Sequence, residues 1–234
     1  MLATQCLRGF FSVSVVMFAL AVLSPLAYAI PTELFFSEYI EGTSSNKALE
    51  IYNGTGSAID LGTAGYNVQM FFNGNISAGT TINLSGTVST NGVFVLAPST
   101  ADVNILSKTN QITVGGVLWF TGNDTVVLRK GSTMIDVIGQ IGVDPGTGWG
   151  TSPTSTANAT LQRKSSIWGG DTNSADAFDP SIEWNGFTQD TFSGLGTHSV
   201  AAPLGAPVPI PSTLLLLGSG LVGMVGIGRK RLKK

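Results

Sequence analysis

The sequence predicts an all-β fold, an antiparallel sandwich or barrel, on three observations. Apolar residues in the middle of the chain recur with a period of two rather than 3.6. Glycine supplies 30 of the 234 residues, and Asn-Gly and Asp-Pro pairs separate the apolar runs. No segment shows the pattern of an amphipathic helix of three turns. Short strands separated by frequent turns are typical of this fold class.

Residues 1–29 read as a secretory signal peptide rather than as part of the fold. Arg8 supplies a positive charge, and an apolar run of 14 residues follows from Phe10 to Leu23. Ala27 and Ala29 give the small-x-small pattern that signal peptidase accepts, so we expect cleavage after Ala29. The alternative, an uncleaved anchor, is less favoured because a bilayer needs about 20 residues. Cleavage would remove the single cysteine of the chain.

Residues 30–199 carry the predicted strands, and about 170 residues are enough to bury one sizeable core. The run 92–97 is apolar throughout, which predicts a strand buried on both faces. In the run 133–141 the alternation places Ile135, Val137 and Ile141 on one face and Asp136 on the other. The predicted strands are 34–40, 48–52, 66–72, 92–97, 117–120, 125–130, 133–141 and 159–164.

Four Asn-Gly pairs predict tight turns, since both residues accept positive φ angles. They are Asn53-Gly54, Asn73-Gly74, Asn91-Gly92 and Asn185-Gly186. Asp144-Pro145 and Asp179-Pro180 predict loops.

Several blocks of residues 30–199 resemble bacterial lamin tail domains. The most specific are FSEYIEG at 36–42, NKALEIYN at 46–53 and the step Asp60-Leu61. Weaker ones are FTGND at 120–124, VVLRK at 126–130, IDVIG at 135–139, TLQRK at 160–164, FDP at 178–180 and EW at 183–184. The resemblance implies an immunoglobulin-like antiparallel β-sandwich. It also implies a binding or adhesion module without enzymatic activity.

The C-terminus has three parts after a Pro/Ala linker at 200–207. A short motif, Val208-Pro209-Ile210-Pro211, precedes an apolar, glycine-rich stretch at 214–228. A basic cluster that contains Arg229, Lys230 and Arg231 ends the chain. Fifteen residues rise by roughly 22 Å in a helix, which is short for a bilayer core of about 30 Å. Basic residues favour the cytoplasmic side, so the main body would lie outside.

This tail resembles the sorting signal of exosortase substrates, the PEP-CTERM class. Ile210 stands where glutamate is most usual, which resembles the motifs of related exosortase subtypes. The resemblance implies an exported bacterial protein that is held transiently in the inner membrane by the C-terminal helix. An exosortase would then cut near 209–212 and release the body to the cell surface or extracellular matrix. The alternative is a plain anchor that is never processed.

Composition excludes several classes of function. With one His and one Cys, the chain lacks the residues for zinc sites, Cys-His chemistry or a disulfide framework. All 14 acidic residues but only six basic ones lie between Glu33 and Asp190, so this stretch carries a net charge of −8. An acidic body is a poor partner for phosphate backbones, and we expect no nucleic-acid binding.

No catalytic motif is present, and we expect no enzyme. His198 is the only candidate general base, and its place beside the linker predicts an exposed residue. Glycosidases use a pair of carboxylate residues for catalysis, so an extracellular hydrolase that uses Glu38 and Glu50 is one alternative. Glu41 and Glu183 are also available, although such residues more often face solvent or support a turn.

Asp171, Asn173 and Asp176 form an oxygen-rich loop, which suits calcium although the spacing is not that of an EF-hand. A calcium-dependent carbohydrate-binding module is therefore the first alternative, ahead of the hydrolase, and otherwise no cofactor is expected. The four tryptophans at 119, 149, 168 and 184 favour core packing over a ligand surface. The leading prediction is an exported structural or adhesive protein whose partners are polysaccharide or surface proteins.

Overall fold

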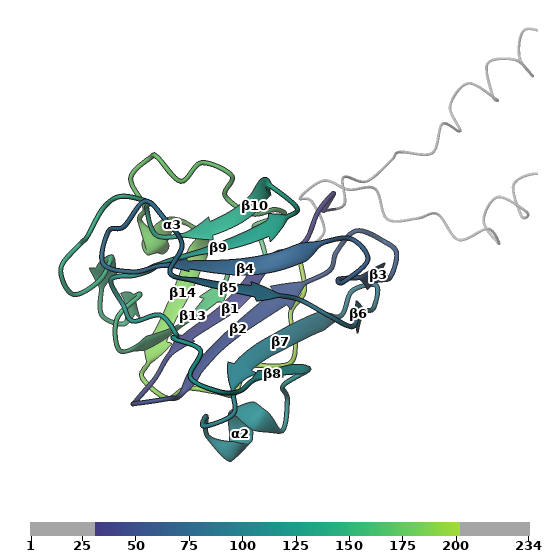
Figure 1. Cartoon of the computed structure of the whole chain (residues 1–234), viewed down its shortest axis with the longest axis horizontal. Coiled ribbons are helices and arrows are strands. Elements are labelled where there is room, and N and C mark those ends of the chain that lie inside the picture. The colour runs from purple at the N-terminus through teal and green to yellow at the C-terminus, as the bar shows by residue number, and fades with distance from the viewer. Residues whose placement is uncertain (1–30, 202–234) are drawn as a thin grey trace, which may run out of the picture. The chain divides into compact units, whose positions relative to one another are not determined.

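The computed structural model describes residues 31–201, and these form two β-sheets packed face to face (Figure 1). The larger sheet has six strands in the order β14 (Trp184–Thr188), β13 (Ala159–Arg163), β1 (Phe35–Glu41), β2 (Lys47–Tyr52), β7 (Val93–Pro98) and β8 (Gln111–Thr113). The smaller sheet has four, in the order β10 (Thr133–Ile138), β9 (Thr125–Lys130), β4 (Tyr66–Phe71) and β5 (Thr80–Asn83). The prediction of an all-β fold is confirmed.

Four shorter strands and two helical turns complete the described part of the chain. The short pairs are β3 (Ile59–Asp60) with β6 (Thr87–Val88), and β11 (Gly150–Thr151) with β12 (Thr154–Ser155). The helical turns are α2 (Val103–Leu106) and α3 (Pro180–Glu183). Each begins after an aspartate, Asp102 or Asp179, whose carboxylate accepts a backbone N–H two residues on.

The main core lies between the two sheets. Alternate residues of β2, β4 and β9 pack in this core, as a period of two requires. In β1 a β-bulge between Phe36 and Glu38 places the core residues Phe36 and Tyr39 three positions apart. The rings of Tyr39 and Phe120 stack in this core with centroids 4.6 Å apart. Trp184 is also buried in it, and Trp119 packs against it from the side. Core packing is thus the observed role of Trp184.

A second cluster covers the outer face of the six-stranded sheet. Val95 and Ala97 of β7 point into this cluster, while Phe94 and Leu96 point into the main core. The prediction that 92–97 forms a strand buried on both faces is therefore confirmed. The cover comes from Ile105 of α2 and from Leu195, which lies after the last strand.

Leu195 belongs to a segment that we call the C-terminal strap, residues 190–201. It begins at the β1–β2 turn, where the carboxylate of Asp190 accepts hydrogen bonds from the backbone N–H and the hydroxyl of Thr43. It ends where the N–H of Ala201 donates to the carbonyl of Ser165. The strap therefore runs the length of β1 along the outer face of the sheet.

Three sequence predictions about strands and turns are wrong. Residues 117–120 form no strand, and Val117 and Leu118 are exposed. Asn185-Gly186 lies inside β14 rather than in a turn, because Gly186 packs against the backbone of Pro153 and Thr154 where a side chain would not fit. The sandwich is not wholly antiparallel either, since β7 and β8 are parallel. The chain between them crosses over through α2, as a parallel pairing requires.

The alternation predicted for 133–141 holds for Asp136 and Val137, which face opposite ways, but Ile135 does not share the face of Val137 and Ile141 as predicted, because it packs in the main core. A β-bulge between Met134 and Asp136 shifts the register of β10 by one residue. Asp136 is consequently fully buried, while Ile138 enters the main core and Val137 joins a separate outer cluster. A shift of one residue moves every following side chain to the opposite face.

Candidate functional site

A polar pocket of about 430 Å³ lies between the strap and the outer face of the six-stranded sheet. Its floor is formed by Ser37 and Glu38 of β1, which are both 1% exposed. The exposed residues Asn185, Thr197 and Ser199 also line it. The full set of lining residues is Ser37, Glu38, Gln162, Arg163, Ser165, Asn185, Thr197, His198 and Ser199.

Glu38 and Glu50 are direct partners across β1 and β2, and both are buried. Glu50 is fully bonded, because its carboxylate accepts the hydroxyl of Ser37 at 2.7 Å and the N–H of Gly196 at 2.5 Å. Glu38 differs, since its Oε1 atom is buried and has no hydrogen-bond partner among residues 31–201. The expectation that these carboxylates face solvent or support a turn is therefore wrong.

Burial, reinforced by the charge of Glu50, raises the pKa of Glu38 to about 8. A hydrogen bond from Gln162 and the positive charge of Lys108 act in the opposite direction. Burial raises the pKa of Glu50 as well, although its bonds to Ser37 and Gly196 lower it. At neutral pH, Glu38 is therefore the member of this pair that carries a proton.

His198 is not the exposed residue that the sequence predicts. Its ring packs edge-on against Tyr52, with centroids 4.9 Å apart, and against Phe35 at 5.8 Å. Burial lowers the pKa of His198 to about 4, so the ring is neutral at neutral pH. Its Nε2 atom is buried and has no hydrogen-bond partner among the described residues. His198 and Glu38 line the same pocket.

This arrangement supports binding better than hydrolysis. A glycosidase needs two carboxyl groups that reach opposite sides of one bond, about 5–9.5 Å apart. Glu50 has no exposed surface and its oxygens are held by Ser37 and the strap. Two residues that line the pocket, Glu38 and His198, instead each have one buried polar atom without a hydrogen-bond partner among the described residues.

Arg163 also lines the pocket, but its positive charge is paired with the carboxylates of Asp136 and Glu183. The guanidinium donates to both oxygens of Asp136, at 2.8 and 2.9 Å, and to Glu183 at 2.6 Å. Its Nε donates to the carbonyl of Phe36, and its Cζ atom lies 4.3 Å from the ring centroid of Trp184. Glu183, one of the carboxylates offered to catalysis by the sequence, thus serves this buried ion pair.

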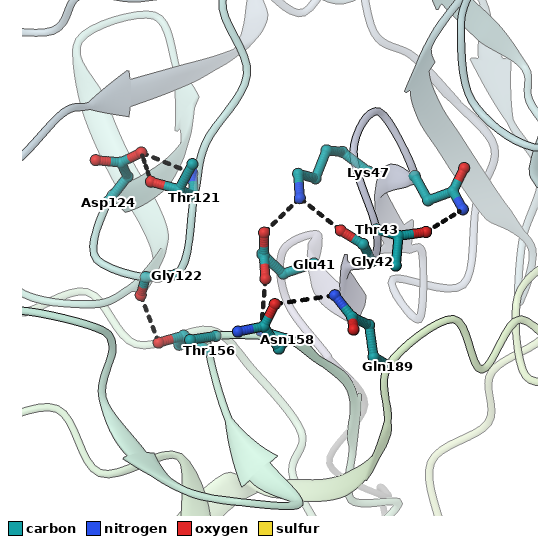
Figure 2. A network of polar contacts seen from close by, with 12 residues as sticks. Glu41, Gly42, Thr43, Lys47, Thr121, Gly122, Asp124, Thr156, Asn158 and Gln189 are labelled. Carbon is teal, nitrogen blue, oxygen red and sulfur yellow. Dashed lines mark hydrogen bonds and ion pairs between the residues drawn. The ribbon is translucent and has the colours of Figure 1, made fainter.

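Glu41 lies in a second saturated network at the far end of β1, shown in Figure 2. Its carboxylate pairs with Lys47 and accepts the backbone N–H of Asn158, while Lys47 also donates to the carbonyl of Gly42. The amide of Gln189 donates to Asn158 at 2.9 Å. These contacts tie β1 and β2 to Asn158, just before β13, and to Gln189, just before the strap, and leave no oxygen of Glu41 for chemistry.

Two of the three residues offered for calcium, Asp171 and Asp176, lie along a second cavity of about 410 Å³, and Asn173 does not line it. Asp171 and Asp176 line it together with Asp179 and Glu183. One oxygen of Asp171 accepts the N–H of Asn173, and Asn173 in turn accepts the N–H of Ala175. Within residues 31–201 no three His, Cys, Asp or Glu side chains converge as metal ligands would. The pocket of Glu38, which is lined by residues with unpartnered buried polar atoms, is therefore the stronger candidate site.

Sequence reasoning singled out Glu38 but missed Ser37, Gln162, Asn185 and the strap. A usable signal was present, because Glu38 and Glu50 each interrupt an otherwise apolar strand, FFSEYI and ALEIY. A charged residue inside such a run indicates either a functional group or a buried pair. The residues around it come from three distant segments, and no local pattern marks them.

The predicted signals at the two ends fall outside the described residues. These are the cleavage site at Ala27 and Ala29, the motif Val208-Pro209-Ile210-Pro211, the helix at 214–228 and the basic stop Arg229, Lys230 and Arg231. Between residues 31 and 201, no helix has the length and apolar character that a membrane span requires.

Residues 29–142 match the family model of the Lamin Tail Domain, which agrees with the resemblance seen in the sequence. No curated protein and no solved structure shows significant similarity to the chain. The match ends in the loop after β10, whereas β13 and β14 lie between residues 159 and 188. β13 pairs with β1, and β14 pairs with β13, in the same sheet. The six-stranded sheet therefore needs residues beyond the matched segment.

Proposed function

We propose that this chain is an exported, non-enzymatic protein of the cell surface or extracellular matrix, with a structural or adhesive binding role. The observation that carries the proposal is the lamin tail match over residues 29–142 on a β-sandwich. Such domains generally act as binding modules. The hydrogen-bonding of Glu41, Glu50 and Glu183 supports the non-enzymatic part, because these carboxylates are committed to the fold.

The route to the surface follows from the two ends of the chain. Signal peptidase would remove residues 1–29. An exosortase-type enzyme would then act at Val208-Pro209-Ile210-Pro211, after the apolar stretch 214–228 had held the chain in the inner membrane. The support for this route is the order of the three C-terminal parts together with the signal-peptide pattern.

The test is the intact mass of the protein in separated fractions of its native host. Loss of residues 1–29 and of the tail beyond about Ser212, with the protein in the surface or matrix fraction, is the expected result. A species that retains Lys234 in the inner membrane would mean an ordinary anchor. That result would contradict the proposed role in the matrix, and the domain would act at the outer side of that membrane.

A calcium-dependent carbohydrate-binding module is the second candidate, favoured by the acidic side chains that share the second cavity. It predicts that calcium raises the melting temperature and that Asp171→Asn abolishes the increase, because a ligand of the folded state stabilises it. Magnesium at the same concentration is the control. A melting temperature that does not respond to calcium would remove this candidate.

A further inference from the structure

We propose that the pocket between the strap and β1 binds a neutral sugar residue, with Glu38 as the central hydrogen-bonding group. This inference rests on the proposed function, because it names the class of ligand that the binding module would recognise. Unpartnered buried atoms support it, as do the chemistry of the lining and the size of the pocket.

The first observation is a buried polar side chain with nothing to bond. Glu38 is 1% exposed and lines the pocket, and its Oε1 has no partner within residues 31–201. A buried acceptor or donor without a partner costs stability, so native proteins rarely retain one. His198 lines the same pocket, and its buried Nε2 also has no partner within residues 31–201. Two unpartnered buried atoms at one pocket indicate that a ligand completes their hydrogen bonds.

The second observation is that the lining offers hydroxyl and amide groups and no free charge. Ser165, Thr197 and Ser199 present hydroxyls, and Gln162 and Asn185 present amides. The charge of Arg163 is neutralised by Asp136 and Glu183. Hydroxyls and amides both donate and accept, which matches the hydroxyls of a sugar.

The protonation states agree with a neutral ligand. Because its pKa is about 8, Glu38 carries a proton at neutral pH, and His198 is uncharged because its pKa is about 4. A protonated Glu38 can donate to a sugar hydroxyl, and neutral His198 can accept from one or donate to one. Glu50 and Lys108 also act on Glu38, but Glu50 is bonded to Ser37 and to the strap.

The third observation is the shape of the site. Its volume of about 430 Å³ lies within the roughly 300–1,000 Å³ that is usual for small-ligand pockets. Gly194 keeps the strap close to the floor, because a side chain there would overlap Gln162 and Glu38. The strap thus forms a fixed wall beside β1, and a preformed wall reduces the ordering cost of binding.

The experiment uses the full chain in a zwitterionic detergent, since detergents with sugar headgroups would compete. The probes are the methyl glycosides of glucose, galactose and mannose, with glycerol and calcium chloride as comparison ligands. Saturation-transfer NMR detects binding, and titration gives Kd. A single sugar ring at such a site is expected to bind with a Kd on the order of 1 mM.

Two variants test the site itself. Glu38→Met keeps the length of the side chain and removes both oxygens, and Asn185→Tyr blocks the pocket from an exposed strand position. We expect each to weaken binding of the preferred glycoside at least about tenfold. Asn83→Tyr, the same change at an exposed position of β5 outside the pocket, should leave Kd unchanged. Melting temperatures verify folding, and Asn185→Tyr decides the result if Glu38→Met unfolds.

Three outcomes would overturn the inference. These are no saturation transfer to any glycoside, equal affinity for glycerol, or unchanged binding by Asn185→Tyr. In the first case water satisfies Glu38, and the pocket is structural. A chain that reaches the matrix but binds no sugar leaves the proposed function intact. A chain that stays in the inner membrane contradicts the proposed function even where the sugar binds.

Discussion

Glu38 makes the stability of this protein depend on pH in an unusual direction for a glutamate. Its pKa is about 8 in the folded protein, against 4.5 for the free side chain. Between these values the folded state binds more protons than the unfolded state. The free energy of unfolding from this group therefore decreases as the pH rises from about 4.5 to about 8, and is constant above that range.

We predict that Glu38→Gln becomes progressively more stable relative to the wild type as the pH rises. Between pH 5 and pH 9 the difference in unfolding free energy should change by on the order of 2–4 kcal/mol in favour of the variant. Glu50 and Lys108 are present in both proteins, so their titration largely cancels. Denaturant unfolding at pH 5, 7 and 9 measures the difference.

Glu33→Gln is the matched control, with the opposite sign. Burial alone would raise the pKa of Glu33, but hydrogen bonds from Tyr66, the N–H of Leu34 and Lys130 lower it overall. This variant should therefore lose stability at neutral pH and lose less in acid, below the pKa of the carboxyl. A constant difference between wild type and Glu38→Gln at all three pH values would contradict the assignment.

Glycine at position 186 is required by packing rather than by backbone conformation. A Cβ atom there would overlap the backbone of Pro153 and Thr154, and backbone cannot move aside as a side chain can. We predict that Gly186→Ala lowers the unfolding free energy by about 1–3 kcal/mol or more, as overpacking does. Gly169→Ala, where nothing lies within 4 Å, should change the melting temperature little. Equal effects of the two changes would show that the contact is not tight.

At the scale of elements, Arg163 joins four segments through one side chain. It lies on β13 and bonds to Asp136 of β10, Glu183 of α3 and the carbonyl of Phe36 in β1. Its side chain and that of Asp136 have no exposed surface. The bulge that turns Asp136 inward thus creates the partner that Arg163 needs.

Removing only one member of this pair should be costly. We predict that Arg163→Met lowers the unfolding free energy by about 3–5 kcal/mol, because Asp136 is left buried and unpaired. The double variant Arg163→Met with Asp136→Leu should recover part of the loss, since no uncompensated charge remains. Denaturant unfolding of the cycle measures the coupling.

Arg129→Met serves as the control for loss of an arginine. Arg129 is only partly buried and donates to the carbonyl of Ser132, so we expect a loss within about 1 kcal/mol. A double variant no more stable than Arg163→Met alone would mean that packing of the guanidinium, rather than the charge of Asp136, explains the loss.

At the scale of the whole molecule, the folded unit extends beyond the segment that matches the Lamin Tail Domain model. That segment ends at residue 142, but β13 pairs with β1 and β14 pairs with β13. Leu161 of β13 and Trp184 at the start of β14 belong to the main core. The strap then covers the outer face with Leu195 and Phe192.

Truncation should reveal these contributions in order. A chain that ends at Ala201 is expected to keep the melting temperature of the body. A chain that ends at Gln189 exposes the outer cluster and should lose about 3 kcal/mol or more, since burying one large apolar side chain contributes about 1.5–3 kcal/mol. A chain that ends at Gly142 lacks β13 and β14 of the six-stranded sheet, as well as the short pair β11–β12, and should be cleaved rapidly by protease. Equal melting temperatures for the chains ending at 189 and 201 would contradict a stabilising role of the strap.

Features that depend on a local pattern could be predicted from the sequence. The strands predicted at 34–40, 48–52, 66–72, 92–97, 125–130, 133–141 and 159–164 each overlap an observed strand, and the apolar run at 92–97 predicted burial on both faces. These features follow from neighbouring residues, because successive side chains of a strand point to opposite faces. Glu38 and Glu50 were visible as charges inside apolar strands, although their burial was not foreseen.

Which residues meet across the fold became known from the tertiary structure. The bulge between Met134 and Asp136 separated Ile135 from the face of Val137, and Asn185-Gly186, expected in a turn, lies in β14 with Gly186 against Pro153 and Thr154. His198, expected to be exposed, packs against Tyr52, which is distant in the sequence. These outcomes depend on strand register and on packing between segments, and a local pattern carries no information about either.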